Sequence, residues 1–193
     1  MTPPLILASS SPYRKLLLER FGLPFACASP DIDERPLPGE QPEQLAVRLA
    51  IAKAQALAAR YPKHLIIGSD QVAALGGEIL GKPGTAERAL GQLRRQSGQS
   101  VRFYTGVALL DSASGHHRML TDTTTVVFRS LDDDEIHRYL SREQPWDCAG
   151  SFKMESLGIA LFEQVDTLDP TALMGLPLIG LARMLREFGV GVV

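Results

Sequence analysis

Acids and lysines that could act on a phosphate occur at four places in the first half of the chain. Glu34 lies in an acidic loop, and Asp70 follows an apolar run, so we expect it at the carboxyl end of a strand, where open α/β sheets place ligands. Lys53 stands in an alanine-rich segment, and Lys82 lies in a Gly-Lys-Pro-Gly loop. Taken alone, three of them have a structural alternative: Asp70 as a turn aspartate, Glu34 as part of a solvated loop, and Lys53 as a lysine extended along an apolar surface. Together, carboxylates that suit Mg²⁺ and cations that neutralise phosphate indicate attack on a phosphorus atom.

Residues 5–15 combine a short apolar run, three serines and a proline that begins a helix. Proline is favoured in the first helical turn, where its missing N–H costs nothing. Free backbone N–H groups, the hydroxyls of Ser9 and Ser10 and the guanidinium of Arg14 would then form an anion site. A serine-capped helix with a surface arginine is the alternative for this stretch taken alone.

The elements that must position these residues alternate between strands and helices. Apolar and β-branched runs predict strands at 5–8, 25–28, 65–70, 78–80, 100–110, 117–128 and 158–164. Helical spacing and capping signals predict helices at 12–21, 42–61, 86–96, 133–142 and 177–188. This order, with a hairpin after the early alternation, indicates a single α/β domain over 1–193 with a mixed sheet.

Bulk composition excludes several classes of protein. The net charge is −2 over 193 residues and the basic residues are scattered, so we expect no nucleic-acid binding. No apolar stretch approaches the ~20 residues of a membrane helix, and the Met-Thr-Pro-Pro start lacks a basic leader segment. We therefore predict no signal peptide, no membrane partner and a cytoplasmic location. Cys27 and Cys148 lack a Cys-x-x-Cys spacing, which predicts two small core residues.

Several motifs occur in the order found in the Maf-like nucleotide pyrophosphatases, and the chain resembles that family from about Leu5 to Arg186. The motifs are Leu-Ile-Leu-Ala-Ser-Ser-Ser-Pro-x-Arg, Asp33-Glu34, Ala-x-x-Lys53-Ala, Gly-Ser-Asp70-Gln, Gly-Lys82-Pro, Tyr-Thr-Gly106 and Cys-Ala-Gly-Ser-Phe152. The resemblance implies an α/β fold similar to the inosine triphosphate pyrophosphatases. In such a fold, a mixed, twisted sheet with flanking helices carries two lobes around a deep cleft.

The resemblance also implies an activity, a metal and roles for individual residues. A nucleoside triphosphate would be hydrolysed to its monophosphate and pyrophosphate with a divalent cation, Mg²⁺ or Mn²⁺. Asp70 would accept a proton and share the metal with Glu34. The phosphates would contact Ser9, Ser10, Arg14, Lys53 and Lys82. A homodimer is suggested as well.

Three positions bear on the substrate. The branch of the family that acts on dTTP and UTP typically has Arg, Thr and Gln where this chain has Tyr13, Gln71 and Glu155. Gln71 and Glu155 look like the branch that hydrolyses 7-methyl-GTP. That branch more often has Trp at the position of Tyr13, so an aromatic face is kept.

The chemistry of 7-methylguanine supports the same interpretation. N7-methylation leaves the ring positively charged, so an aromatic face from Tyr13 or Trp146 would gain a cation–π term of about 0.5–2 kcal/mol. Glu155 could accept hydrogen bonds from the guanine N–H groups. Two alternatives stay open: a dTTP/UTP pyrophosphatase, and a nucleotide-binding regulator of septum formation that does not hydrolyse its ligand.

Overall fold

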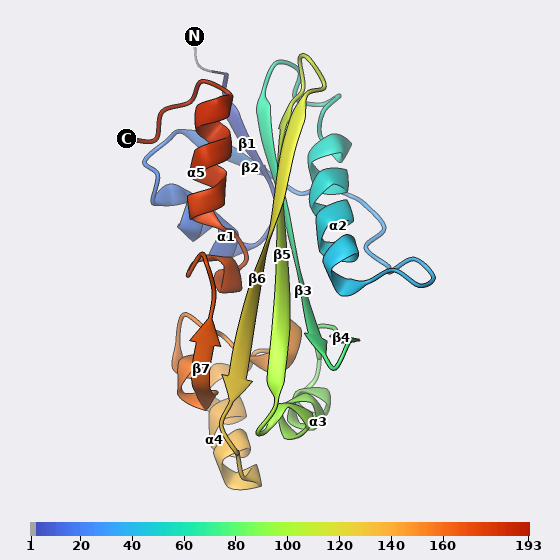
Figure 1. Cartoon of the computed structure of the whole chain (residues 1–193), viewed down its shortest axis with the longest axis vertical. Coiled ribbons are helices and arrows are strands. Elements are labelled where there is room, and N and C mark those ends of the chain that lie inside the picture. Colours follow the sequence, from blue (N-terminus) through green and yellow to red (C-terminus); the bar gives the residue numbers. More distant parts are fainter. Residues whose placement is uncertain (1–2) are drawn as a thin grey trace.

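Seven strands form one twisted sheet in the computed structural model, which describes residues 3–193 (Figure 1). The strand order is β2-β1-β3-β5-β6-β7, and the short β4 pairs with β3 beside that path. The strands are β1 Leu5–Ala8, β2 Phe25–Ala28, β3 Leu65–Leu75, β4 Glu78–Leu80, β5 Ser100–Asp111, β6 His117–Phe128 and β7 Phe162–Asp166. β1 pairs in parallel with β2 and β3, and the other pairs are antiparallel, which confirms the predicted mixed sheet.

Five α-helices of the described chain flank this sheet. They are α1 Pro12–Glu19, α2 Pro42–Ala56, α3 Ala86–Gln96, α4 Asp133–Glu143 and α5 Leu178–Glu187. Side-chain caps begin two of these helices: Thr85 accepts the N–H of Arg88 at the start of α3, and Asp132 and Glu135 form a capping box on α4. α1 and α5 cover one face of the upper part of the sheet, and α2 covers the other face (Figure 1).

Two large apolar clusters define an upper and a lower lobe, in the orientation of Figure 1. In the upper lobe, β1, α1 and α5 pack on β3 and β5, through leucines such as Leu7 and Leu185. In the lower lobe, α3 and α4 pack on the far ends of β3, β5 and β6, around Phe103 and Phe128. Because the same long strands pass through both clusters, the lobes share one sheet.

β3 is longer than the sequence predicted. The prediction that this strand ends at Asp70 is wrong, because it continues to Leu75 in antiparallel pairing with β5, with Asp70 opposite Gly106. The pairing of β3 with β1, however, ends at the Ala8–Gly68 pair. Asp70 therefore lies in the middle of its own strand and just beyond the carboxyl end of the neighbouring β1.

Helix α2 packs unusually close to the sheet. A Cβ atom on Gly68 would lie 2.1 Å from the carbonyl oxygen of Ala50, and one on Gly106 would lie 2.5 Å from that of Ala46. Only glycine at these two positions lets the helix backbone lie directly on β3 and β5. This close approach brings the C-terminal half of α2, with Lys53, over the middle of β3.

Other predictions need smaller corrections. The predicted strand over 158–164 is a 3₁₀ turn at Leu157–Leu161 followed by β7, and α2 ends at Ala56 rather than near 61. Cys27 is exposed, because β2 is the edge strand of the sheet, so its prediction as a core residue is wrong.

In residues 3–193 no helix has the length and apolar character of a membrane span. Met1 and Thr2, on which the no-leader prediction partly rests, lie outside the described residues.

Candidate active site

A cleft of about 620 Å³ lies between the two lobes. Its walls come from the serine turn before α1, the loop before α2, the middle of β3, the loop after β4 and the segment around 147–155. Every predicted site residue lines it: Ser9, Ser10, Tyr13, Arg14, Glu34, Lys53, Asp70, Gln71, Lys82 and Glu155. The fold therefore gathers residues that are spread over most of the sequence.

Lys53 lies between the two carboxylates predicted to hold a metal. Its Nζ atom is 2.6 Å from Oδ1 of Asp70 and 2.7 Å from Oε1 of Glu34. Lys53 and Asp70 are buried, whereas the side chain of Glu34 is 56% exposed to the cleft. Each carboxylate uses one oxygen for Lys53, which leaves its second oxygen for water or a metal ion.

The pKa of Glu34 reports the charge of its surroundings. Burial alone would raise that pKa, but the hydrogen bond from Lys53 and the positive charges of Lys53, Lys82 and Arg14 outweigh burial and lower it. Glu34 is therefore ionised at neutral pH and lies within reach of three cations. The same cations would surround a phosphate chain in this part of the cleft.

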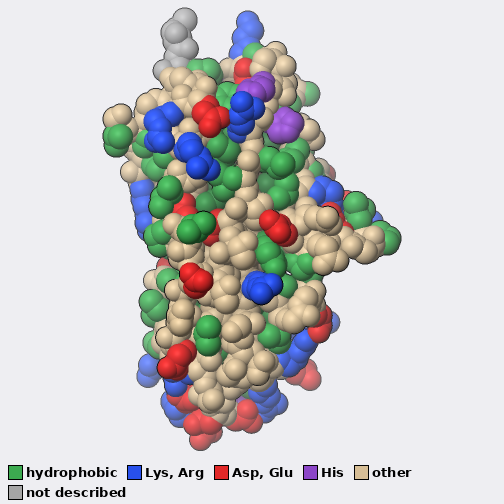
Figure 2. All heavy atoms as spheres, in the orientation of Figure 1, with side chains coloured by type: hydrophobic (Ala, Val, Ile, Leu, Met, Phe, Trp, Pro, Cys, Tyr) green, Lys and Arg blue, Asp and Glu red, His purple; other side chains and the backbone are tan. Residues whose placement is uncertain are grey.

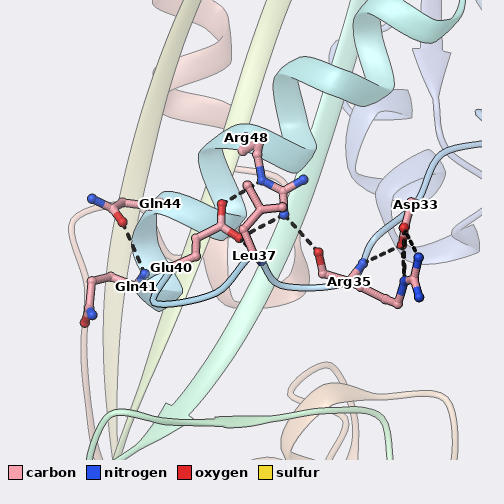
Figure 3. A network of polar contacts seen from close by, with 7 residues as sticks. All are labelled: Asp33, Arg35, Leu37, Glu40, Gln41, Gln44 and Arg48. Carbon is pink, nitrogen blue, oxygen red and sulfur yellow. Dashed lines mark hydrogen bonds and ion pairs between the residues drawn. The ribbon is translucent and has the colours of Figure 1, made fainter.

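The loop that carries Glu34 is tied to α2 by polar contacts (Figure 3). Arg48 of α2 binds Glu40 through two hydrogen bonds, of 2.6 and 2.8 Å, and donates a third to the backbone carbonyl of Arg35 at 3.1 Å. Arg35 in turn pairs with Asp33 at 2.6 Å. These contacts hold the chain on both sides of Glu34 and so fix its approach to Lys53.

The serine turn forms the predicted helix N-terminus. Ser9 is buried and its Oγ accepts the N–H of Ser11, while Ser11 caps α1 by accepting the N–H of Arg14. Ser10 is exposed at the tip of the turn. The positive end of the α1 dipole and these polar groups therefore face the cleft that holds Lys53.

Arg14 is positioned by a backbone carbonyl that the sequence did not reveal. Its Nε donates to the oxygen of Gly175 at 2.9 Å, and the Ser69 hydroxyl donates to the same oxygen at 2.9 Å. Burial lowers the pKa of Arg14, and the charges of Asp70 and Glu34 oppose that effect. The guanidinium is thus held beside the acidic pair, with its terminal amino groups available to an anion.

Gln71 lines the cleft and also forms hydrogen bonds with neighbouring segments of the chain. Its Nε2 lies 3.0 Å from Oγ1 of Thr105 and from the carbonyl oxygens of Ala172 and Leu173. The amide nitrogen therefore supports the turn that leads to Gly175, and the carbonyl oxygen of Gln71 is what it can offer to a nucleotide.

The end of the cleft near Tyr13 is acidic. Burial, followed by the negative groups Asp147 and Glu155, raises the pKa of Cys148 to about 12, so its thiol is neutral and cannot serve as a thiolate nucleophile. The pKa of Tyr13 is also raised, first by burial and then by Cys148, Asp147 and Glu155. Trp146 packs into the lower-lobe cluster, so of the two candidate aromatic residues it is Tyr13 that lines the cleft.

Two acids are a small set for a resident metal. Within the described chain no group of three or more His, Cys, Asp or Glu side chains could hold an ion. Mg²⁺ nevertheless often binds through one or two carboxylates and takes its other ligands from water and substrate phosphates. Glu34 and Asp70 therefore fit a divalent cation that is bound together with a phosphate ligand.

Basic side chains do not form a continuous band on the face drawn in Figure 2, where Lys and Arg are interspersed with Asp and Glu. The mixed sheet and this cleft define an α/β protein whose cleft gathers cations and two carboxylates, a combination that fits a phosphate chain bound with a divalent cation.

Residues 4–188 match the Maf-like protein family, and the chain belongs to that family. It is 59% identical over 188 residues to the 7-methyl-GTP pyrophosphatase of Pseudomonas aeruginosa, covering 97% of this chain and 98% of that protein. It is 58% identical to the 7-methyl-GTP pyrophosphatase of Aromatoleum aromaticum, covering 96% of both chains. These relatives match the subgroup that the sequence motifs resemble.

A solved structure supports the predicted fold. The HAM1 protein from Coxiella burnetii superposes with a TM-score of 0.54 at 17% identity, covering 96% of this chain and 99% of that chain. At this identity the similarity concerns the fold alone, and it confirms the expected α/β architecture.

Proposed function

We propose that this chain hydrolyses 7-methyl-GTP to 7-methyl-GMP and pyrophosphate. Relatives that are 56–59% identical over 96–97% of the chain are named 7-methyl-GTP pyrophosphatases, which supports this substrate. The observation that carries the chemistry is the Lys53 ammonium between Asp70 and Glu34, in a cleft shared with Arg14 and the serine turn.

The triphosphate lies along the cationic part of the cleft in this proposal. Ser9, Ser10 and the free N–H groups of the α1 turn contact its oxygens, and Arg14, Lys53 and Lys82 spread its negative charge. A divalent cation held by Glu34 and Asp70 would neutralise further phosphate charge and acidify a nearby water.

Asp70 aligns a water molecule with the α-phosphorus and accepts its proton as the new oxygen–phosphorus bond forms. The bond from the α-phosphorus to the oxygen that bridges to the β-phosphate breaks, and pyrophosphate leaves with that oxygen. Its charge is met by Lys82 and Arg14. Alignment is the main contribution of Asp70, because a fixed attack geometry removes much of the entropic cost.

The Tyr13 end of the cleft would hold the base. An aromatic face and nearby negative charge suit a methylated, positively charged guanine better than a neutral pyrimidine. Glu155 would accept from the guanine N–H groups, and Asp147 adds negative charge at the same end. A cytoplasmic location and a homodimer stay predictions.

The test is pyrophosphate release with Mg²⁺ from 7-methyl-GTP, GTP, dTTP, UTP and CTP, with Asp70→Asn as the control. We expect preferred turnover of 7-methyl-GTP, and a loss of at least 10²-fold in Asp70→Asn with nucleotide binding retained. Preference for dTTP or UTP would contradict the substrate. Tight binding without turnover would favour a non-hydrolysing regulator.

A further inference from the structure

Two segments of the lower-lobe wall meet on one face of α3. One is the loop 81–84, which follows β4 and carries Lys82. The other is the turn 148–152, which precedes Glu155. Both segments line the cleft, the first at its phosphate end and the second near Tyr13. Their relative position therefore sets the distance between phosphate and base contacts.

A single amide group on α3 joins these segments. The Nε2 of Gln92 donates to the carbonyl oxygen of Gly81 at 2.9 Å, one residue before Lys82. The Oε1 of the same Gln92 accepts a hydrogen bond from the Oγ of Ser151. Each end of the amide thus serves one segment, and the half-buried side chain of Gln92 spans the gap between them.

The turn 148–152 needs such support because its backbone is strained. Gly150 has φ +76° and Ser151 has φ +62°, and the second value is unfavourable for any residue with a side chain. Gln96, one helical turn after Gln92, is buried and donates to the carbonyl oxygen of Gly150 at 2.9 Å. The α3 face therefore holds this turn at two successive residues, and surroundings that impose such a conformation are a common feature of functional sites.

A backbone bond adds to the link. The N–H of Gly84 donates to the carbonyl oxygen of Trp146 at 2.9 Å, so the loop also binds the chain two residues before the turn 148–152. The bond from Gln92 to Gly81 lies on the other side of Lys82. The loop is thus held on both sides of its lysine, as the Arg48 contacts hold the loop of Glu34.

We propose that Gln92 is a positioning residue that fixes Lys82 and Glu155 relative to one another, so that contacts to the phosphates and to the base depend on one rigid wall. The expected effect on kinetics rests on the proposed function, whereas the structural link through Gln92 does not. It predicts that one substitution on α3, outside the cleft lining, changes both phosphate handling and base preference.

The kinetic test uses Gln92→Met, which keeps the length of the side chain and removes both hydrogen bonds. We expect kcat/KM for 7-methyl-GTP to fall about 10-fold and the preference for 7-methyl-GTP over GTP to narrow. We also expect Lys82→Met to cost less in this background than in the parent, because Lys82 is already misplaced. The control is Gln55→Met, the same change at an exposed position of α2. It should leave kcat/KM, the preference for 7-methyl-GTP and the cost of Lys82→Met unchanged.

Two further variants separate the two ends of the amide. Gln92→Glu keeps an acceptor for Ser151 and loses the donor to Gly81, so it reduces the effect of Lys82→Met while the base preference stays. For Ser151→Ala we expect the reverse: the preference for 7-methyl-GTP over GTP narrows, and the loss of activity caused by Lys82→Met stays as in the parent. Either variant decides the question if Gln92→Met does not fold.

Hydrogen exchange in the absence of nucleotide tests the structural link without activity. We expect Gln92→Met to speed exchange at the amides of Gly84 and Ser151, and Gln55→Met to leave both unchanged. A variant that only lowers the melting temperature, with unchanged exchange, base preference and Lys82 effect, would overturn the inference. If the parent protein hydrolyses no nucleotide, the proposed function fails, and exchange alone decides the role of Gln92.

Discussion

Lys53 sets the charge balance of the cleft at the scale of single residues. The ammonium lies within 2.7 Å of both carboxylates, and it is buried together with Asp70. Two acids without this cation would repel each other and a phosphate chain alike. In the proposed function, one lysine therefore both pairs with the buried Asp70 and meets the negative charge of the phosphates.

Lys53→Met tests that dual role. We expect kcat/KM to fall by at least 10²-fold, as for the loss of a preorganised donor, and the melting temperature to fall because Asp70 is left buried without its partner. Steady-state kinetics and thermal unfolding measure the two effects. Lys15→Met removes an exposed lysine with a weak helical ion pair and is the matched control, for which neither quantity should change appreciably. Wild-type turnover in Lys53→Met would contradict the assignment of this cluster.

The Arg48–Glu40 contact gives a pH-dependent stability. The hydrogen bonds from Arg48 and from the backbone of Leu37 lower the pKa of Glu40 from 4.5 to about 2. A lowered pKa in the folded state means that the stabilisation is present above about pH 4.5 and is lost as the pH falls towards 2. We therefore expect Glu40→Gln to melt at a lower temperature than the parent at pH 6. This difference in melting temperature should shrink as the pH falls from about 4.5 towards 2. A difference that is constant from pH 6 to pH 2 would contradict this.

That the candidate site residues line one cleft was predictable where a charged side chain stands in a recognisable motif. Asp70, Glu34, Lys53 and Lys82 are charged groups inside short motifs, so their types indicated a phosphate site before any fold was known. The Gly175 carbonyl was not predictable, because every residue has one and only the fold decides which carbonyl faces Arg14. Gln92 was missed because a glutamine between helical residues has no distinguishing pattern.

At the scale of elements, the contact between α2 and the sheet decides where Lys53 lies. Gly68 and Gly106 allow the helix backbone to approach β3 and β5 directly. The sequence predicted both α2 and β3 but not their separation. That separation depends on the absence of a Cβ atom at Gly68 and Gly106, and neither residue stands out in the sequence as a point of contact with a helix.

Gly106→Ala tests this spacing. Its Cβ would lie 2.5 Å from the backbone oxygen of Ala46, so α2 must shift and the contact of Lys53 with Asp70 must lengthen. We expect a loss of at least 10-fold in kcat/KM and a lower melting temperature. Gly91→Ala on α3 is the control: a Cβ there meets nothing within 4 Å, and the change should stabilise by about 0.5–1 kcal/mol. Equal activities for the two variants would show that α2 tolerates displacement.

The error in β3 has a physical explanation. Ser69, Asp70 and Gln71 are polar and resemble a turn, but Ser69 and Asp70 are buried and bind other parts of the chain. A strand interior can hold polar residues when each has a partner, and those partners come from β5, α2 and the 172–175 turn. Local patterns cannot reveal partners so distant in sequence.

At the scale of the whole molecule, the long strands make the two lobes interdependent. We propose that the chain unfolds as one domain, because β3, β5 and β6 contribute to both apolar clusters. Far-UV circular dichroism reports all elements, whereas the fluorescence of the single tryptophan, Trp146, reports the lower lobe. We expect the two unfolding curves to coincide. Separate midpoints would show that the lobes unfold independently.

The bond between Arg14 and Gly175 joins residues 161 positions apart, and the same end of the sheet packs the first strand against the last helix. During synthesis on the ribosome, β1 and α1 emerge first, yet Leu181 and Leu185, which cover them, emerge near the end. Leu7 and Leu17 therefore stay uncovered for most of translation, when unburied apolar surface favours aggregation. A nascent chain cannot complete the cleft until Gly175 is released, and its first strand and helix stay uncovered until α5 follows. We therefore expect a stop codon shortly before Gly175 to yield an insoluble product rather than a weak enzyme.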